Sequence, residues 1–190
     1  MAMRVGWRFG GRSGEHEVSI RSAGASSQGL QTGGNATQYE VVPVLIHKDG
    51  TWASASTAKS VLESGKPAPQ DEGTIGELPP AAPAVKRLPV TELLSNIDIW
   101  FPAMHGPNGE DGTIQGLFEV LEMPYVGCGV LGSSVGMDKL ASKTAFTQAG
   151  IPQVKYRGVT RAEIYSNPCI FPKVCDDLEE ALGYPCFVKP

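Results

Sequence analysis

The chain has 190 residues, of which 41% are hydrophobic and 19% are charged, and its formal net charge is −4 at pH 7. This composition excludes a disordered chain, and the acidic balance argues against nucleic acid as the main partner. No apolar run is long enough to span a bilayer, and the first residues lack the apolar region of a signal peptide, so we expect a cytoplasmic protein without a membrane partner. The four cysteines form no C-x-x-C pair, so we expect no zinc site and interpret each cysteine as a small core residue.

The amino-terminal half alternates between strand and helix patterns. Residues 4–9 predict a first strand, Gly10-Gly11 a tight turn, and residues 15–30 a helix. Tyr39–Ile46 predicts a second strand, in which Pro43 favours an edge position because proline has no N–H to donate to a neighbouring strand.

The middle of the chain is less regular. Residues 48–52 predict a hairpin turn into a short strand. Residues 63–90 are rich in proline, glycine, alanine and glutamate, and they predict a surface excursion with little regular structure. A short helix is predicted at residues 92–96, immediately before a buried strand at 97–101.

A glycine-rich loop follows that strand. The segment Phe101–Gly116 contains His105 and the carboxylates of Glu110 and Asp111, and a helix from residue 113 to 123 comes next. Parallel α/β proteins bind ligands at the carboxyl ends of strands, and a helix N-terminus there offers free N–H groups to anions. We interpret Glu110 and Asp111 as residues that cap this helix and shape the loop.

The carboxyl-terminal part predicts shorter elements. They are a strand at 124–129, a turn at 130–134, a helix from 137 to 149, a strand at 154–159, a helix at 176–182 and a strand at 184–190. The order of elements along the chain predicts an α/β fold with a parallel sheet. We expect a first domain at 1–131 and a second at 132–190. Because one strand with a helix or two is not a packed domain, we expect the chain to be a fragment.

Glu15 and His105 follow two different predicted strands. If the strands at 4–9 and 97–101 are neighbours, both residues lie at one edge of the sheet. A carboxylate can hold a substrate ammonium and an imidazole can contact a substrate carboxylate, so the pair suits a zwitterion such as an amino acid. These residues alone leave an alternative open, in which Ser13 and Glu15 only stabilise the start of the helix.

Two lysines form a second candidate site. Lys139 lies in the first turn of a predicted helix, where the helix dipole disfavours a cation, and Lys189 ends an apolar predicted strand. Both positions suit a phosphate partner. The alternative is an ordinary exposed lysine, which is the commoner fate of this residue type.

Five collinear segments resemble the D-alanine–D-alanine ligases, a family of the ATP-grasp superfamily. They are Phe9–Ser19, Phe101–Gly116, Tyr125–Val130, Gly136–Lys139 and Gly183–Pro190. The resemblance implies a Rossmann-like (pre-ATP-grasp) substrate-binding domain followed by the beginning of an ATP-grasp domain. It implies an enzyme that joins two D-alanines through an acyl phosphate, with ATP and Mg²⁺ or Mn²⁺, for peptidoglycan precursor synthesis.

The same resemblance implies roles for individual residues. Glu15 holds the ammonium group of the first D-alanine, His105 lies near the carboxylate that reacts, and Ser19 lies beside the same substrate. Lys139 and Lys189 contact the phosphates of ATP. The family's metal ligands lie beyond residue 190, so we assign no metal ligand and expect this chain alone to have no ligase activity. A homodimer is also implied, with the helix after Glu15 and the helix at 113–123 as candidate surfaces.

The chain departs from the family pattern at Trp7-Arg8, where aliphatic residues are usual. Because an unpaired buried charge is costly, we expect Arg8 to reach solvent or a carboxylate. Gly132–Gly136 resembles the glycine-serine loop that closes over ATP. It precedes Met137–Lys139, however, so we interpret it as an inter-domain connection.

Two other functions compete with the ligase hypothesis. One is a non-catalytic module that binds an amino acid or dimerises. The other is a different ATP-grasp enzyme, such as a carboxylase or another amino-acid ligase. Glu15 within the segment Gly10–Ser19 disfavours the second, because the resemblance ties that segment to the D-alanine family.

Overall fold

The computed structural model describes residues 1–67, 96–165 and 170–189, so the predictions made for residues 68–95 lie outside its range. The chain divides into two compact units, Met1–Met137 and Asp138–Pro190. The assignment of residues 1–131 and 132–190 to a substrate-binding and an ATP-grasp domain stays a prediction.

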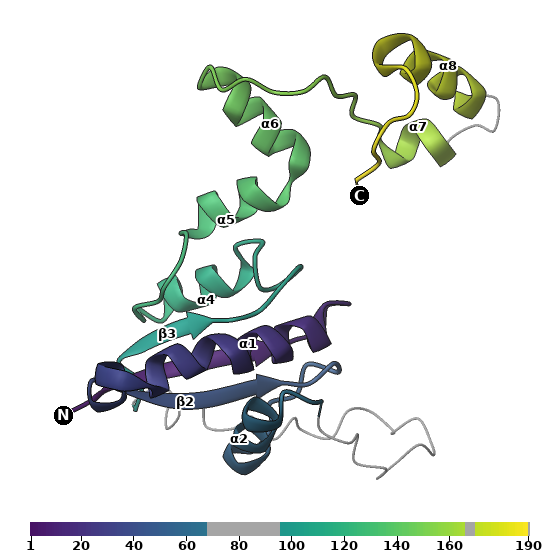
Figure 1. The fold of residues 1–190 in the computed structure, drawn as a ribbon. Coiled ribbons are helices and arrows are strands. Elements are labelled where there is room, and N and C mark those ends of the chain that lie inside the picture. The colour runs from purple at the N-terminus through teal and green to yellow at the C-terminus, as the bar shows by residue number, and fades with distance from the viewer. Residues whose placement is uncertain (68–95, 166–169, 190) are drawn as a thin grey trace, which may run out of the picture. The chain divides into compact units, whose positions relative to one another are not determined.

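The first unit is built on a three-stranded sheet with the order β2-β1-β3 (Figure 1). The strands are β1 (Met3–Gly10), β2 (Tyr39–Ile46) and β3 (Ile99–Pro102). The central strand β1 pairs in parallel with both neighbours. This confirms the parallel α/β prediction and the adjacency of the first and third predicted strands. β2 lies at an edge of the sheet, as Pro43 predicts.

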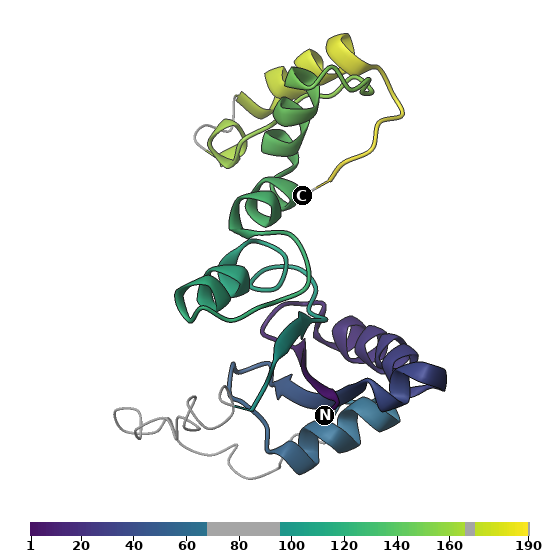
Figure 2. The ribbon, with the colours of Figure 1, turned by 90° about the vertical axis from the view of Figure 1, so that its left-hand side faces the viewer.

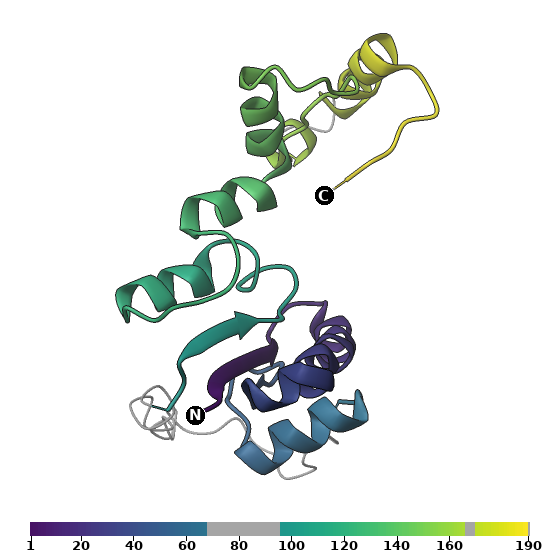
Figure 3. The same cartoon turned by 60° about the vertical axis from the view of Figure 1, so that its left-hand side comes forward.

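Helices cover both faces of this sheet (Figures 2 and 3). On one face lie α1 (His16–Gln31) and α2 (Ala55–Ser64), and on the other lies α4 (Thr113–Val120). Side chains alternate along β1, so Val5, Trp7 and Phe9 all point toward α1 and α2. The core on that face also contains Ile20, Ala23, Leu45, Ala58, Val61, Leu62 and Ala103. Val44, Ile97, Trp100, Ile114 and Phe118 form the core beneath α4.

The helix α2 and the 3-10 helix η1 (Gly33–Thr37) were not predicted. The ends of α2 carry clear sequence signals. The Ser54 hydroxyl accepts a hydrogen bond of 3.2 Å from the Thr57 N–H, and Gly65 closes the helix at φ +65°. The start of the surface excursion that we expected from residue 63 therefore still belongs to a helix.

Two predicted strands of the first unit are reduced to single bridges. Residues 48–52 form the expected turn, in which the His47 N–H donates to the Thr51 carbonyl at 2.8 Å, and one antiparallel bridge joins Ile46 to Trp52. In the predicted strand at 124–129, Tyr125 makes one parallel bridge with Trp100. The predicted turn at 130–134 is wrong, because Val130–Met137 forms the helix α5.

The second unit contains α6 (Lys139–Gln148), α7 (Arg161–Tyr165) and α8 (Ile170–Leu182). The predicted helix from 137 is confirmed as α6, with Asp138 as its N-cap. The predictions of strands at 154–159 and 184–190 are wrong over the residues described, which form no regular structure. A strand needs a neighbour to accept its hydrogen bonds, and no strand pairs with these segments within the described residues.

Arg8 is largely withdrawn from solvent, and no carboxylate pairs with it among the described residues. It is 9% exposed, and its Nε and Nη1 atoms are buried without a hydrogen-bond partner. Its guanidinium carbon lies 5.3 Å from the centre of the Trp52 ring, a cation–π contact. Burial lowers the pKa of Arg8 from its ordinary value to about 10, so the side chain stays charged at neutral pH.

The cysteine prediction also needs correction. Cys128 is exposed, and Cys175 and Cys186 are half-buried, so these three are not core residues. Among the residues described, none of the helices combines the length and apolar character that crossing a bilayer requires.

Candidate substrate site

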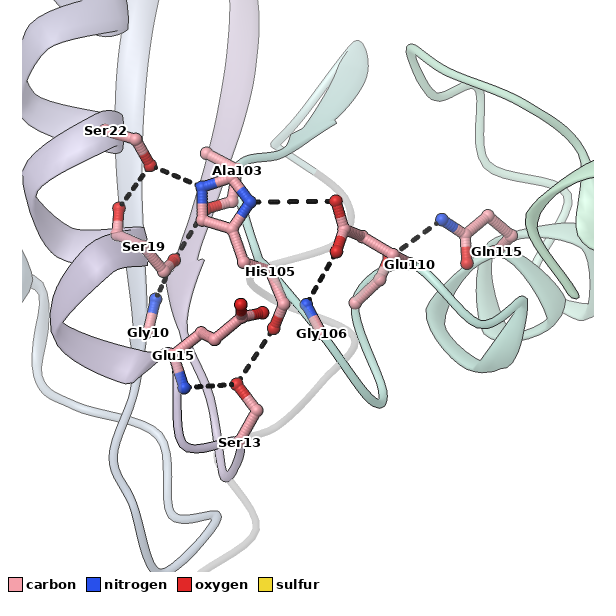
Figure 4. Close-up of polar contacts among 11 residues, drawn as sticks. Gly10, Ser13, Glu15, Ser19, Ser22, Ala103, His105, Gly106, Glu110 and Gln115 are labelled. Atoms are coloured by element: carbon pink, nitrogen blue, oxygen red, sulfur yellow. Dashed lines mark hydrogen bonds and ion pairs between the residues drawn. The ribbon is translucent and has the colours of Figure 1, made fainter. Parts of the chain in front are cut away.

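The candidate site lies where β1 and β3 end and the chain turns into α1 (Figure 4). Gly10 makes this turn at φ +83°, and a side chain there would collide with the Ile46 carbonyl oxygen. Only glycine combines that backbone conformation with so close an approach. The turn places Glu15 immediately before the first residue of α1.

Ser19 joins three elements beneath the site. Its hydroxyl accepts a hydrogen bond of 2.9 Å from the Gly10 N–H and donates one of 2.6 Å to the Ala103 carbonyl. The side chain is fully buried, so these two bonds fix the end of β1 and the start of the loop after β3 against α1. The role of Ser19 beside a substrate stays a prediction. Its hydrogen bonds to Gly10 and Ala103 hold elements of the fold together.

Ser13 makes a second connection nearer the surface. Its hydroxyl donates a hydrogen bond of 2.8 Å to the His105 carbonyl and accepts one of 3.2 Å from the Glu15 N–H. One hydroxyl therefore bridges the backbones of the two residues that the sequence singled out. It supports the start of the helix, as predicted, although Glu15 rather than Ser13 occupies the N-cap position.

Glu15 and His105 come to the same edge of the sheet. The Glu15 side chain is exposed and packs against the backbone of Gly106, where an added Cβ would lie 2.7 Å from Glu15 Oε2. The His105 side chain is 34% exposed. A carboxylate and an imidazole that both remain accessible at one edge of a sheet can bind the ammonium and carboxylate groups of a small zwitterion.

Two partners hold the His105 ring. Its Nε2 atom lies 2.8 Å from the Ser22 hydroxyl, and its Nδ1 atom lies 3.7 Å from Glu110 Oε1. The other Glu110 oxygen accepts a hydrogen bond of 2.7 Å from the Gly106 N–H. The sequence analysis missed Ser22, yet a signal was present. Glu15, Ser19 and Ser22 are spaced four and three residues apart, which places them on one face of a helix.

The loop between β3 and α4 is shaped by its own carboxylates. Asp111 accepts hydrogen bonds of 2.9 Å from the N–H groups of Asn108 and Thr113, so it caps the start of α4 as predicted. Its slight burial raises its pKa, but these hydrogen bonds outweigh that effect and leave the pKa below its usual value. Glu110 shapes the loop but does not cap α4, because its carboxylate is directed to Gly106 and His105.

The predicted phosphate-binding lysines both lie in the second unit. Lys139 is the first residue of α6, and Lys189 lies in the irregular segment near the end of the chain. Both side chains are exposed. Within the described part of the chain, no group of three or more His, Cys, Asp or Glu side chains is placed to hold a metal ion. The described residues therefore do not form a site for the Mg²⁺ or Mn²⁺ that the resemblance implies.

Comparison with known proteins decides the family. The family model described as "D-ala D-ala ligase N-terminus" matches residues 4–128. The chain belongs to the D-alanine–D-alanine ligase family. A second model of these D-alanine–D-alanine ligases, "D-ala D-ala ligase C-terminus", matches residues 145–190. The resemblance stated from the sequence is thereby confirmed.

Individual relatives agree with this family. A D-alanine–D-alanine ligase from Synechococcus sp. (strain CC9311) is 50% identical over 188 residues, which cover 99% of this chain and 52% of that protein. The chain thus spans about half the length of this relative. Among solved structures, one match is the VanG D-Ala:D-Ser ligase from Enterococcus faecalis, at 25% identity and a TM-score of 0.63. The match covers 100% of this chain and 52% of the VanG chain. A second match is the D-alanine–D-alanine ligase from Coxiella burnetii, at 28% identity and a TM-score of 0.57. This match covers 92% of this chain and 50% of the Coxiella chain.

Proposed function

We propose that this chain supplies the binding site for the first substrate of an ATP-dependent ligase that joins two D-alanines. The placement of Glu15 and His105 at one edge of the sheet carries the proposal. Glu15 binds the ammonium group of the first D-alanine, and His105 lies beside its carboxylate. In the overall reaction this carboxylate takes the γ-phosphoryl group of ATP, the amine of the second D-alanine displaces phosphate, and a peptide bond forms.

The charges around the site support an amino-acid substrate. Glu110 faces the His105 imidazole, Glu15 packs against the neighbouring Gly106, and all three side chains remain accessible. An ammonium group gains from the carboxylates, and a substrate carboxylate gains from the imidazole. The site therefore favours a ligand that carries a positive and a negative group a few ångströms apart.

The nucleotide part of the proposal rests on the second unit. Lys139 and Lys189 contact the phosphates of ATP, and their exposure leaves both ammonium groups accessible. Phosphoryl transfer depends on positioning and charge neutralisation, which lysine side chains can provide. In this proposal the ligase acts in the cytoplasm, and the peptide that it forms is used for peptidoglycan precursor synthesis.

Calorimetric titration of the 190-residue chain with D-alanine tests the amino-acid site. Replacement of the Glu15 carboxylate by an amide removes a charge-assisted contact, so Glu15→Gln is expected to weaken D-alanine binding about tenfold to a hundredfold. Glu17→Gln is the matched control, because Glu17 is an exposed acid on the same helix that pairs with Lys48 instead.

Equal affinity of Glu15→Gln and the wild type would contradict the assignment, and so would a wild-type chain that binds no D-alanine. The lysines are tested by the variants Lys139→Met and Lys189→Met, which are expected to weaken ATP binding. If the chain binds D-alanine but these variants leave ATP binding unchanged, the result would favour the alternative, a module that binds an amino acid without catalysis.

A homodimer is part of the same proposal. The side chains of Leu117, Val120 and Leu121 are exposed on and just after α4. Exposed apolar side chains gathered on one element suit a contact with another protein surface. Sedimentation equilibrium of the wild type and of Val120→Lys, at 82% exposure the most accessible of the three, measures whether this face joins two copies.

A further inference from the structure

The His105 ring is held at both nitrogen atoms by groups from different elements (Figure 4). Ser22, in the second turn of α1, lies 2.8 Å from Nε2. Glu110, in the loop before α4, lies 3.7 Å from Nδ1, a distance of ion-pair contact rather than of a hydrogen bond. Ser22 is neither a predicted site residue nor part of the proposed substrate contacts.

The protons on these atoms can be assigned from their chemistry. An ionised carboxylate only accepts, so the Glu110 carboxylate that faces Nδ1 favours the tautomer with a proton on that atom. The Ser22 hydroxyl has a single proton and two neighbours, namely His105 Nε2 at 2.8 Å and the Ser19 carbonyl at 3.1 Å. When the ring is neutral, the hydroxyl donates to Nε2. When the ring carries a second proton, Nε2–H donates to the hydroxyl, which then turns its own proton to the Ser19 carbonyl.

We propose that Ser22 is a positioning residue that keeps the His105 ring and its proton on Nδ1 in one arrangement, in either charge state of the ring. The proposal rests on the proposed function, because it explains how the imidazole is fixed beside the substrate carboxylate. Glu15 is a further charged group of this edge of the sheet, where it packs against the neighbouring Gly106.

A serine beside a histidine that faces a carboxylate is also the arrangement of a hydrolytic nucleophile. The position of Ser22 argues against that role. The N–H groups around Ser22 lie past the first turn of α1 and are used within the helix, so they offer no pair of free donors for an oxyanion. The hydroxyl is therefore suited to hold the ring, not to attack a substrate.

Nitrogen-15 NMR of the histidine rings tests the proposal on the 190-residue chain without any ligand. The chain has three histidines, and His105→Gln assigns the signal. In the wild type, at a pH where the ring is neutral, the proton is expected on Nδ1. In Ser22→Ala the ring loses its Nε2 partner, so the signal is expected to shift to a mixture of the two tautomers. Ser22→Thr keeps the hydroxyl and is expected to restore the wild-type signal.

Ser26→Ala is the matched control. Ser26 lies one turn further along α1, and its hydroxyl donates to the Ser22 carbonyl of the same helix at 2.6 Å. This variant is expected to leave the His105 signal unchanged. An unchanged tautomer in Ser22→Ala would overturn the proposal. If Ser22→Ala fails to fold, Glu110→Gln provides the second test, because removing the carboxylate charge is expected to release the proton from Nδ1, and an unchanged signal there would also overturn it.

Titration with D-alanine separates this inference from the proposed function. Ser22→Ala is expected to bind D-alanine about threefold to tenfold more weakly, the effect of one ordinary hydrogen bond. If the tautomer changes but the wild type binds no D-alanine, Ser22 positions the ring and the proposed function fails. If the wild type binds D-alanine and the tautomer in Ser22→Ala stays the same, the proposed function stands and the role of Ser22 fails.

Discussion

The carboxylate of Glu15 lies directly against the backbone of Gly106, where an added Cβ would come within 2.7 Å of Oε2. Gly106 has φ +70°, a conformation that residues with side chains rarely adopt. The glycine thus serves two needs at once, because it allows the loop after β3 to turn and it leaves space for the acid from the start of α1.

Gly106→Ala is expected to push the Glu15 carboxylate away and to weaken D-alanine binding, in addition to a loss of about 1–2 kcal/mol in unfolding free energy from the backbone conformation. Gly65→Ala separates the two effects. Gly65 has φ +65° and no atom within 4 Å of an added Cβ, so it shares the backbone cost without the collision. Equal D-alanine affinity of the two variants would contradict the collision with Glu15.

Ser19→Ala is expected to lower the free energy of unfolding by about 1–3 kcal/mol, because the Gly10 N–H and the Ala103 carbonyl both lose a buried partner. Ser27→Ala is a suitable control, since Ser27 is also buried on α1 but its hydroxyl donates only to the Gly24 carbonyl of its own helix. Urea unfolding measures both variants. A loss in Ser19→Ala no larger than in Ser27→Ala would count against the tie between β1 and the loop.

Arg8→Leu is expected to stabilise the protein by about 1–3 kcal/mol, because it removes a buried charge with unsatisfied N–H donors. The contact with Trp52 that is lost is worth about 2 kcal/mol at such a desolvated site, and it offsets part of the larger cost of burying the charge. Arg8→Lys keeps the charge and is expected to bring no gain. Thermal unfolding compares the three proteins, and a less stable Arg8→Leu would show that the guanidinium contributes more than the burial costs.

The pH dependence of that difference has a definite sign. Burial lowers the pKa of Arg8 to about 10 in the folded protein, whereas the unfolded chain keeps the higher, ordinary value of an exposed guanidinium. The protonated side chain therefore destabilises the fold fully below pH 10, and this cost falls as the pH rises through about 10. The stability advantage of Arg8→Leu is expected to be constant near neutral pH and to shrink in alkaline solution. A gap that widens above pH 10 would contradict the assigned direction.

The strands of the first unit and the helix α1 follow from local pattern, because their apolar periodicity agrees with the packing around β1. Residues 154–159 show the limit of such patterns. They contain apolar residues at strand spacing, but a strand forms only when another strand pairs with it. The helix α5 escaped prediction for the opposite reason, because Gly132, Ser133, Ser134 and Gly136 have low helix propensity and local sequence favours a turn there.

The candidate site was predictable in position but not in its contacts. The strand-to-helix turns at Gly10 and after β3 locate Glu15 and His105 at strand ends, and parallel pairing brings those ends together. Helical spacing could have indicated Ser22 as one partner of the ring, but not Glu110, because its contact with His105 depends on the conformation of the loop. The burial of Arg8 beneath Trp52 depends likewise on the turn that returns the chain to β2.

The hydrogen bond from Ser13 to His105 spans 92 residues of sequence, and the bond from Ser19 to Ala103 spans 84. Contacts between such distant segments form only after the intervening chain has closed into a large loop, which is entropically costly and slow. The acid and the imidazole are therefore expected to meet late in folding, so the appearance of D-alanine binding during refolding would report that the topology of the sheet is complete.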